Sequence, residues 1–234
     1  MVDFARIKAM SNLNTKAWSG FVFLAIILGL LLFVPAWTIL YWQAWVYLAV
    51  FFTSSGVITL YLMKNDPALL ARRISAGPRA EKEKTQKIIM FFVMIAFGAM
   101  FIVSALDYRF MWSDVPLYPV IAGDILVAVG FFIVFLVYKE NTFSSATIEV
   151  DKEQKVISTG PYALVRHPMY SGGLLMLLAT PPALGSWWGL LAFIPTAFLI
   201  IWRLLDEEKL LARDLSGYKE YQQKVRSRLI PGIF

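Results

Sequence analysis

The chain has 234 residues, of which 59% are hydrophobic and only 16% are charged. Because a soluble domain is usually about one quarter charged, and the mean hydropathy here is +0.63, the composition excludes an ordinary soluble protein and indicates an integral membrane protein. The absence of cysteine excludes disulfides and thiolate chemistry, and a single histidine argues against a zinc site. The first apolar run is too long for the apolar core of a cleavable signal peptide, so none is expected.

Six apolar segments are expected to form membrane helices, since a span takes about 20 residues of helix. In chain order they are residues 18–38, 43–63, 88–106, 118–138, 169–184 and 187–205. The fifth segment is short and contains Pro181 and Pro182, and Gly185 with Ser186 predicts a tight turn into the sixth. The hairpin of these two segments could therefore end before the far leaflet. The sequence therefore predicts an all-α integral membrane protein of about six transmembrane segments, the last two forming a helical hairpin. Residues 1–138 would hold four spans, and residues 139–234 would complete the same structural unit.

Lysine and arginine gather in alternate connections between these segments. Three precede the first segment, seven lie in 64–87, four lie in 139–166 and seven lie in 203–228, whereas Arg109 alone lies elsewhere. By the positive-inside rule, this distribution predicts that both termini and the basic loop 64–87 are cytoplasmic.

Within that basic loop, Asp66 and Pro67 are suited to the N-cap and the first position of a short helix. Such a helix would lie at the membrane interface with Arg72 and Arg73 on lipid head groups. The alternative is a loop whose charges only set the topology.

A second short pattern lies after the fourth segment. Residues 147–150 and 155–158 alternate polar and apolar side chains around residues 151–154, which predicts a small β-hairpin.

The first stretch with candidate chemistry is residues 160–170, which read GPYALVRHPMY. Pro168 disfavours a helical conformation at His167 and is itself suited to the first helical position, so the fifth helix should begin at Pro168. The free N–H groups and positive dipole end of that helix would suit a carboxylate or phosphate. The same residues could equally be an interface anchor with Arg166 on phosphates.

The second stretch is RLLDEE, at the end of the last apolar segment. Arg203 and Glu207 are four residues apart and share one helix face. A charge at the edge of the apolar zone is costly and tends to be paired, functional or both, although a plain salt bridge would also explain the spacing. Beyond it, a stripe of Tyr218, Tyr221, Val225 and Leu229 ending at Pro231 predicts an amphipathic helix on the membrane or over the site; an ordinary packed helix is the alternative.

Taken together, these motifs resemble the isoprenylcysteine carboxyl methyltransferase family of integral membrane enzymes. The resemblance rests on GPYALVRHPMYSG, the later R-x-x-x-E-E, and an ending with GY-x-x-Y and RLIP, and it covers residues 141–234. It implies S-adenosyl-L-methionine as cofactor, S-adenosyl-L-homocysteine as product, and a lipophilic or prenylated acceptor taken from the membrane, with neither nucleic acid nor metal as partner. The C-terminal helix would complete the cofactor site, on the cytoplasmic side.

The resemblance also assigns roles residue by residue. Catalytic roles fall on Arg203 and Glu207, and Arg203 would hold the substrate's carboxylate. The cofactor-binding positions are Gln154, Lys155, Val156, Ile157, Tyr162, His167, Pro168, Met169, Tyr170 and Glu207.

The chemistry fits a carboxylate acceptor, which is ionised at pH 7 and needs no strong base. Phospholipid N-methyltransferases share part of the pattern, however, and a phospholipid or small amine would need a base such as His167, Glu207 or Glu208. A nicotinamide-dependent reductase has no support, since no basic pocket for a 2′-phosphate can be named. A non-enzymatic membrane scaffold is the remaining alternative.

Overall fold

The computed structural model describes residues 2–74, 77, 79–81, 83–148 and 154–234, and within them the regular structure is helical. The helices are α1 (Val2–Ala36), α2 (Trp42–Asn65), α3 (Pro67–Ile74), α4 (Lys84–Phe110), α5 (Leu117–Glu140), the 3-10 helix η1 (Gly160–Ala163), α6 (Pro168–Ala183), α7 (Gly189–Asp214) and α8 (Tyr218–Lys224). The predicted all-α class is thereby confirmed.

Among the described residues, five helices are long and apolar enough to cross a membrane. They are Ser11–Ala36, Trp42–Asn65, Lys84–Phe110, Leu117–Glu140 and Gly189–Asp214. The remaining predicted segment forms α6, whose 16 residues fall short of the roughly 20 that a span requires. Its length is limited by the turn that follows: Gly185 has φ +70° and donates to the Pro182 carbonyl at 2.8 Å.

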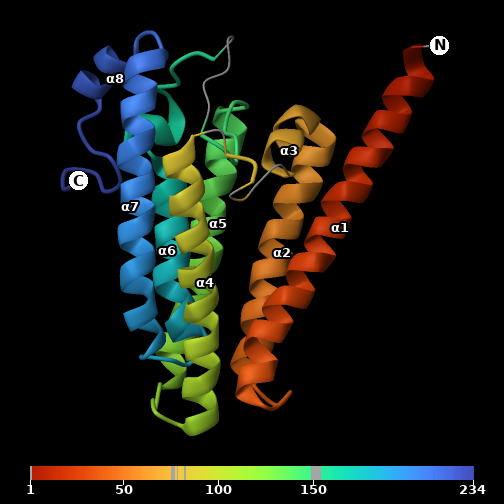
Figure 1. Ribbon diagram of the computed structural model, residues 1–234, viewed down its shortest axis with the longest axis vertical. Helices are drawn as coiled ribbons and strands as arrows, with labels where there is room; N and C mark the ends of the chain where they lie inside the picture. The colour runs from red at the N-terminus through yellow and green to blue at the C-terminus, as the bar shows by residue number, and fades with distance from the viewer. Residues whose placement is uncertain (1, 75–76, 78, 82, 149–153) are drawn as a thin grey trace.

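The long helices stand roughly side by side and run alternately up and down (Figure 1). Helices α4–α7 form one group, and α1 with α2 leans against it, the first turns of α1 extending away from the rest. The short helices α3 and α8 and both ends of the chain lie toward one end of the molecule. The bundle's outer surface exposes large apolar side chains such as Phe23, Phe132 and Phe198, as expected for contact with lipid.

Close packing of α5 against α6 depends on glycine. A Cβ added at Gly172 would lie 2.8 Å from the Gly130 carbonyl oxygen, and one added at Gly123 would lie 2.5 Å from the Ala183 nitrogen. At Gly173, by contrast, a Cβ would meet nothing within 4 Å. Small residues therefore allow the two backbones to approach, as in other membrane helix pairs.

The short helix α3 begins as its sequence predicts. Pro67 is its first residue, and Asp66 Oδ1 accepts the N–H of Leu69 at 2.9 Å. Its arginines have partners within the protein: Arg72 Nη1 donates to the Thr142 carbonyl and Arg73 Nη1 to the Ser145 carbonyl, both at 2.8 Å. These carbonyls belong to a segment without helical hydrogen bonds, so they need side-chain donors.

The expectations of a small β-hairpin and of a C-terminal helix that includes Val225 and Leu229 are corrected. Residues 154–158 form no strand, and residues 149–153 of the predicted hairpin lie outside the described part of the chain. Helix α8 ends at Lys224, so Val225 and Leu229 lie beyond it. The tail pairs instead with the chain before α6, because the carbonyls of Ser227 and Arg228 accept the N–H groups of residues 166 and 167, both at 2.9 Å.

Candidate active site

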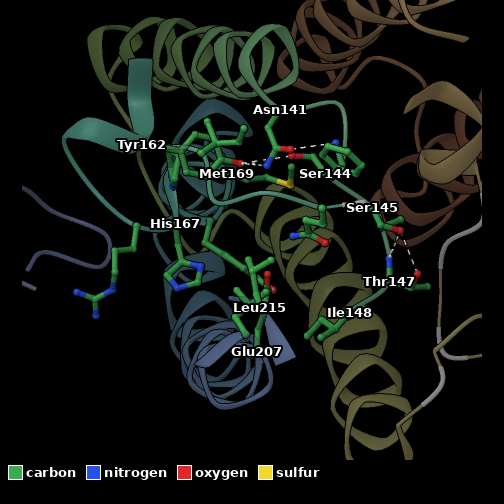
Figure 2. Close-up of a pocket in the computed structure, with 18 of the residues that line it drawn as sticks. Asn141, Ser144, Ser145, Thr147, Ile148, Tyr162, His167, Met169, Glu207 and Leu215 are labelled. Carbon is green, nitrogen blue, oxygen red and sulfur yellow. Dashed lines mark hydrogen bonds between the residues drawn. The ribbon is translucent and has the colours of Figure 1, made fainter. Parts of the chain in front are cut away.

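A cavity of about 280 Å³ lies near the end of the bundle that carries α3 and α8. Its walls come from α4, α7, the start of α6, the segments 141–148 and 154–157, and the region of α8. Every residue to which the resemblance assigns a role lines it: Gln154, Lys155, Val156, Ile157, Tyr162, His167, Pro168, Met169, Tyr170, Arg203 and Glu207. Figure 2 shows several of them around the pocket, with His167, Tyr162 and Met169 on one side and Glu207 of α7 on another.

The start of α6 has the geometry that Pro168 predicts. Pro168 is the first helical residue, and His167 precedes it with φ −125°. The His167 side chain is buried, and its Nε2 lies 3.2 Å from Glu208 Oε1 and 3.4 Å from the hydroxyl of Tyr218. The imidazole is therefore fixed between α7 and α8.

Glu208, rather than Glu207, is the carboxylate that organises this region. Arg166 Nε donates to Glu208 Oε1 at 2.7 Å, and Arg228 Nε donates to Oε2 at 2.8 Å. Arg166 also donates through Nη1 to the carbonyls of Val225 and Arg226. The expectation that Arg166 anchors lipid phosphates is thus corrected: it is buried and ties the C-terminal tail to the helix start.

Glu207 faces the pocket and has a different partner. The hydroxyl of Tyr170 donates to Glu207 Oε2 at 2.5 Å, which links the first turn of α6 to α7. The arrangement leaves a carboxylate on the wall whose second oxygen could accept from an ammonium or hydroxyl group.

Tyr162 is held by residues that the sequence did not identify. Asn141 Nδ2 donates to the Tyr162 hydroxyl at 2.9 Å, and Ser144 Oγ lies 3.4 Å from it. Burial raises the pKa of Tyr162, so the phenol stays neutral at pH 7. The Tyr221 hydroxyl donates to the Tyr162 carbonyl at 2.7 Å, so that α8 and its neighbours support this wall.

Arg203 is buried and has partners remote in sequence. Its Nη1 donates to Gln86 Oε1 at 2.8 Å and its Nη2 to the Ala146 carbonyl at 3.1 Å. Its ion partner is Glu81, with 2.6 Å between Nη2 and Oε1. The described residues include no salt bridge between Arg203 and Glu207, so a plain salt bridge does not explain their spacing. Glu81 and Gln86 were missed because both lie in the basic loop 64–87, where only the need of a buried arginine for a partner could have indicated them.

The fold and this pocket define an all-helical integral membrane protein with a polar site near one end of its bundle. Comparison with known proteins finds matches over part of the chain. The family model described as "Phospholipid methyltransferase" (PEMT) matches residues 118–216, which include the pocket residues from Asn141 to Leu215.

Two curated relatives, from Oryza sativa subsp. indica and subsp. japonica, are both described as "Probable protein-S-isoprenylcysteine O-methyltransferase". Each is 35% identical over 88 residues, covering 35% of this chain and 44% of the relative. The chain therefore spans less than half the length of the curated relatives it matches. Over the region they cover, the matches confirm the resemblance to membrane methyltransferases of the isoprenylcysteine and phospholipid types.

Proposed function

We propose that this protein is a membrane-embedded methyltransferase that uses S-adenosyl-L-methionine and methylates a lipophilic acceptor, the carboxylate of a prenylcysteine-like molecule being favoured. One observation carries the proposal. A single pocket of about 280 Å³ is lined by all eleven residues to which the resemblance assigns cofactor and acceptor roles.

The pocket's donor set suits the cofactor, which would supply an activated methyl group when bound. The first N–H groups of α6, at Met169 and Tyr170, would bind its carboxylate, as helix starts bind anions. Glu207 would accept from its ammonium group or ribose hydroxyls. Residues 154–157 and Tyr162 would form the remaining wall, and His167 would be a positioned neighbour.

The acceptor would approach from the side of the bilayer. Met90 and Val93 of α4 and Ile200 of α7 give the pocket an apolar side, suited to a prenyl chain. The guanidinium of Arg203 would hold the carboxylate through paired hydrogen bonds. Since the carboxylate is already ionised, alignment and proximity would supply much of the rate.

An amine acceptor is the second candidate, favoured by the family model's description as a phospholipid methyltransferase. An amine must lose a proton, so a base is required. Both oxygens of Glu208 are engaged by arginines, so Glu207 and His167 are the candidate bases on the pocket wall.

The same proposal includes sidedness. The distribution of basic residues supports a cytoplasmic location for the pocket and both termini. Reporter fusions at Trp112 and near Ser186 should then read as outside, and fusions at Gly77 and Phe234 as cytoplasmic.

Two measurements test the function. S-adenosyl-L-homocysteine should raise the melting temperature of the purified protein by mass action; no shift at saturating concentration would contradict the cofactor. Methyl-labelled cofactor should then label a prenylcysteine carboxylate in preference to an aminophospholipid. Labelling of the aminophospholipid alone would establish the amine alternative.

A further inference from the structure

Arg203 has both neutral hydrogen-bond partners and charged neighbours. Gln86 accepts from Nη1 at 2.8 Å, and the Ala146 carbonyl accepts from Nη2 at 3.1 Å. Gln86 is itself held by Asp206, whose Oδ2 lies 2.5 Å from the amide nitrogen. These neutral contacts position the guanidinium. The negative charge of Glu81 can therefore affect how strongly Arg203 binds an anionic ligand.

Glu81 acts on Arg203 from behind the pocket wall. Arg203 lines the cavity whereas Glu81 does not, and the Glu81 side chain is 0% exposed. Its Oε2 accepts the N–H of Ile148 at 3.1 Å. Its Oε1 lies 2.6 Å from Arg203 Nη2 but has no hydrogen bond of good geometry. The contact is therefore chiefly one of charge. From the pocket side, Tyr170 and Glu207 also interact with the guanidinium, so a ligand carboxylate would approach Arg203 beside them.

With a carboxylate acceptor, the positive charge of Arg203 favours acceptor binding but can slow the reaction. One acceptor oxygen gains the methyl carbon while the carbon–sulfur bond breaks and its electron pair stays on sulfur, so the acceptor's negative charge disappears along the reaction. A full positive charge beside the carboxylate would stabilise the ionised acceptor more than the transition state. Interactions that favour the ground state lower KM without raising kcat.

We propose that Glu81 tunes Arg203 for this reaction. Its carboxylate offsets the guanidinium charge, so that Arg203 orients the acceptor's carboxylate through hydrogen bonds without binding it too tightly, and the neutral ester is released readily. This inference rests on the proposed function with a carboxylate acceptor. It makes Glu81 a residue that acts through Arg203 and sets acceptor affinity from outside the pocket.

The test compares Glu81→Gln with Glu83→Gln, a matched change at an exposed glutamate just before α4. The protein is loaded with S-adenosyl-L-homocysteine, so that no turnover occurs, and titrated with an N-acylated prenylcysteine and with its methyl ester. In Glu81→Gln the carboxylate should bind roughly tenfold more tightly, as expected for loss of a close competing charge. Affinities for the ester and for S-adenosyl-L-homocysteine should stay within about twofold.

Steady-state kinetics give a second readout. For the carboxylate acceptor, Glu81→Gln should lower KM and kcat together, because it strengthens ground-state binding, while Glu83→Gln changes neither. A purely structural role for Glu81 would instead weaken both ligands. Carboxylate affinity that is unchanged or weaker, with normal S-adenosyl-L-homocysteine binding, would overturn the inference.

The wild-type protein provides a test that does not depend on the variant's folding. If Glu81 offsets the charge of Arg203, the loaded wild type should bind the carboxylate and its ester with affinities within about tenfold of each other. A preference for the carboxylate above roughly 100-fold would indicate an uncompensated guanidinium and overturn the inference. Failure to bind S-adenosyl-L-homocysteine would instead contradict the proposed cofactor, and methylation of amines alone would remove the carboxylate acceptor together with this inference.

Discussion

The guanidinium of Arg166 donates a 2.7 Å hydrogen bond to the carboxylate of Glu208, and both side chains are at most 7% exposed. This pair joins the chain just before α6 to the end of α7. Because Arg228 and His167 contact the same carboxylate, one residue of α7 holds both the start of α6 and the C-terminal tail in place.

Glu208→Gln should therefore destabilise the whole pocket region. Removing one partner of a buried ion pair leaves Arg166 without its compensating charge, which costs about 3–5 kcal/mol. Thermal melting in detergent should show a clearly lower melting temperature. The exposed pair of Arg213 and Asp214 gives the control, since Asp214→Asn should leave melting unchanged. Equal melting of both variants would mean that Glu208 has no such structural role.

The two adjacent glycines of α6 should respond in opposite ways to alanine. At Gly172 the new methyl group would lie 2.8 Å from the Gly130 carbonyl oxygen, so α5 and α6 must separate, at a cost of about 1–3 kcal/mol. At Gly173 it meets nothing within 4 Å, and loss of a helical glycine should stabilise by roughly 0.5–1 kcal/mol. Melting of the two variants in parallel checks both; a lower melting temperature for Gly173→Ala than for Gly172→Ala would contradict the packing.

Arg73 should influence cofactor binding although it lies on α3. Its Nη1 donates to the Ser145 carbonyl at 2.8 Å and lies 3.6 Å from the sulfur of Met169, so it connects two walls of the pocket. Arg73→Ala should weaken binding of S-adenosyl-L-homocysteine by roughly tenfold, the loss expected for a hydrogen bond from a charged donor. Calorimetric titration against Arg79→Ala, an exposed arginine of the same loop, separates this effect from a general loss of charge. Equal affinities of the two variants for S-adenosyl-L-homocysteine would show that Arg73 does not support the cofactor site.

The features that sequence could predict are those that local geometry dictates. Asp66 caps α3, and Pro168 begins α6, because capping and the proline ring act within a few residues. The apolar segments located the long helices for the same reason. The pairing of Arg203 with Glu81 could not be predicted, because the choice of partner depends on how α4 and α7 pack.

The C-terminal tail illustrates the same limit. The spacing of Val225 and Leu229 continues the stripe of α8, yet these residues lie beyond the helix. The tail is instead held by the N–H groups of residues 166 and 167 and by the Arg166 side chain, none of which a local pattern includes. A helical spacing of apolar residues therefore predicted that Leu229 is buried, but it did not predict the conformation of the backbone there.

Arg203→Lys should impair methylation of the acceptor while leaving cofactor affinity nearly unchanged. Arginine binds Gln86 and the Ala146 carbonyl through separate nitrogens and still has donors for a ligand, whereas lysine is a point charge without the planar fork. The acceptor's carboxylate would then be misplaced, and turnover should fall by roughly 100-fold. Affinity for S-adenosyl-L-homocysteine should stay within a fewfold, since Glu207 and the first turn of α6 are unchanged. Kinetics with a prenylcysteine acceptor and calorimetry with the product measure the two effects.

The comparison requires folded protein, because a shorter side chain also disturbs the buried pair with Glu81. A monodisperse variant that binds S-adenosyl-L-homocysteine meets that requirement. If such a variant methylates the carboxylate acceptor at the normal rate, Arg203 does not hold the carboxylate. Normal methylation of an aminophospholipid by the same variant would then favour an amine methyltransferase, with the pocket-lining Glu207 and His167 as the candidate bases.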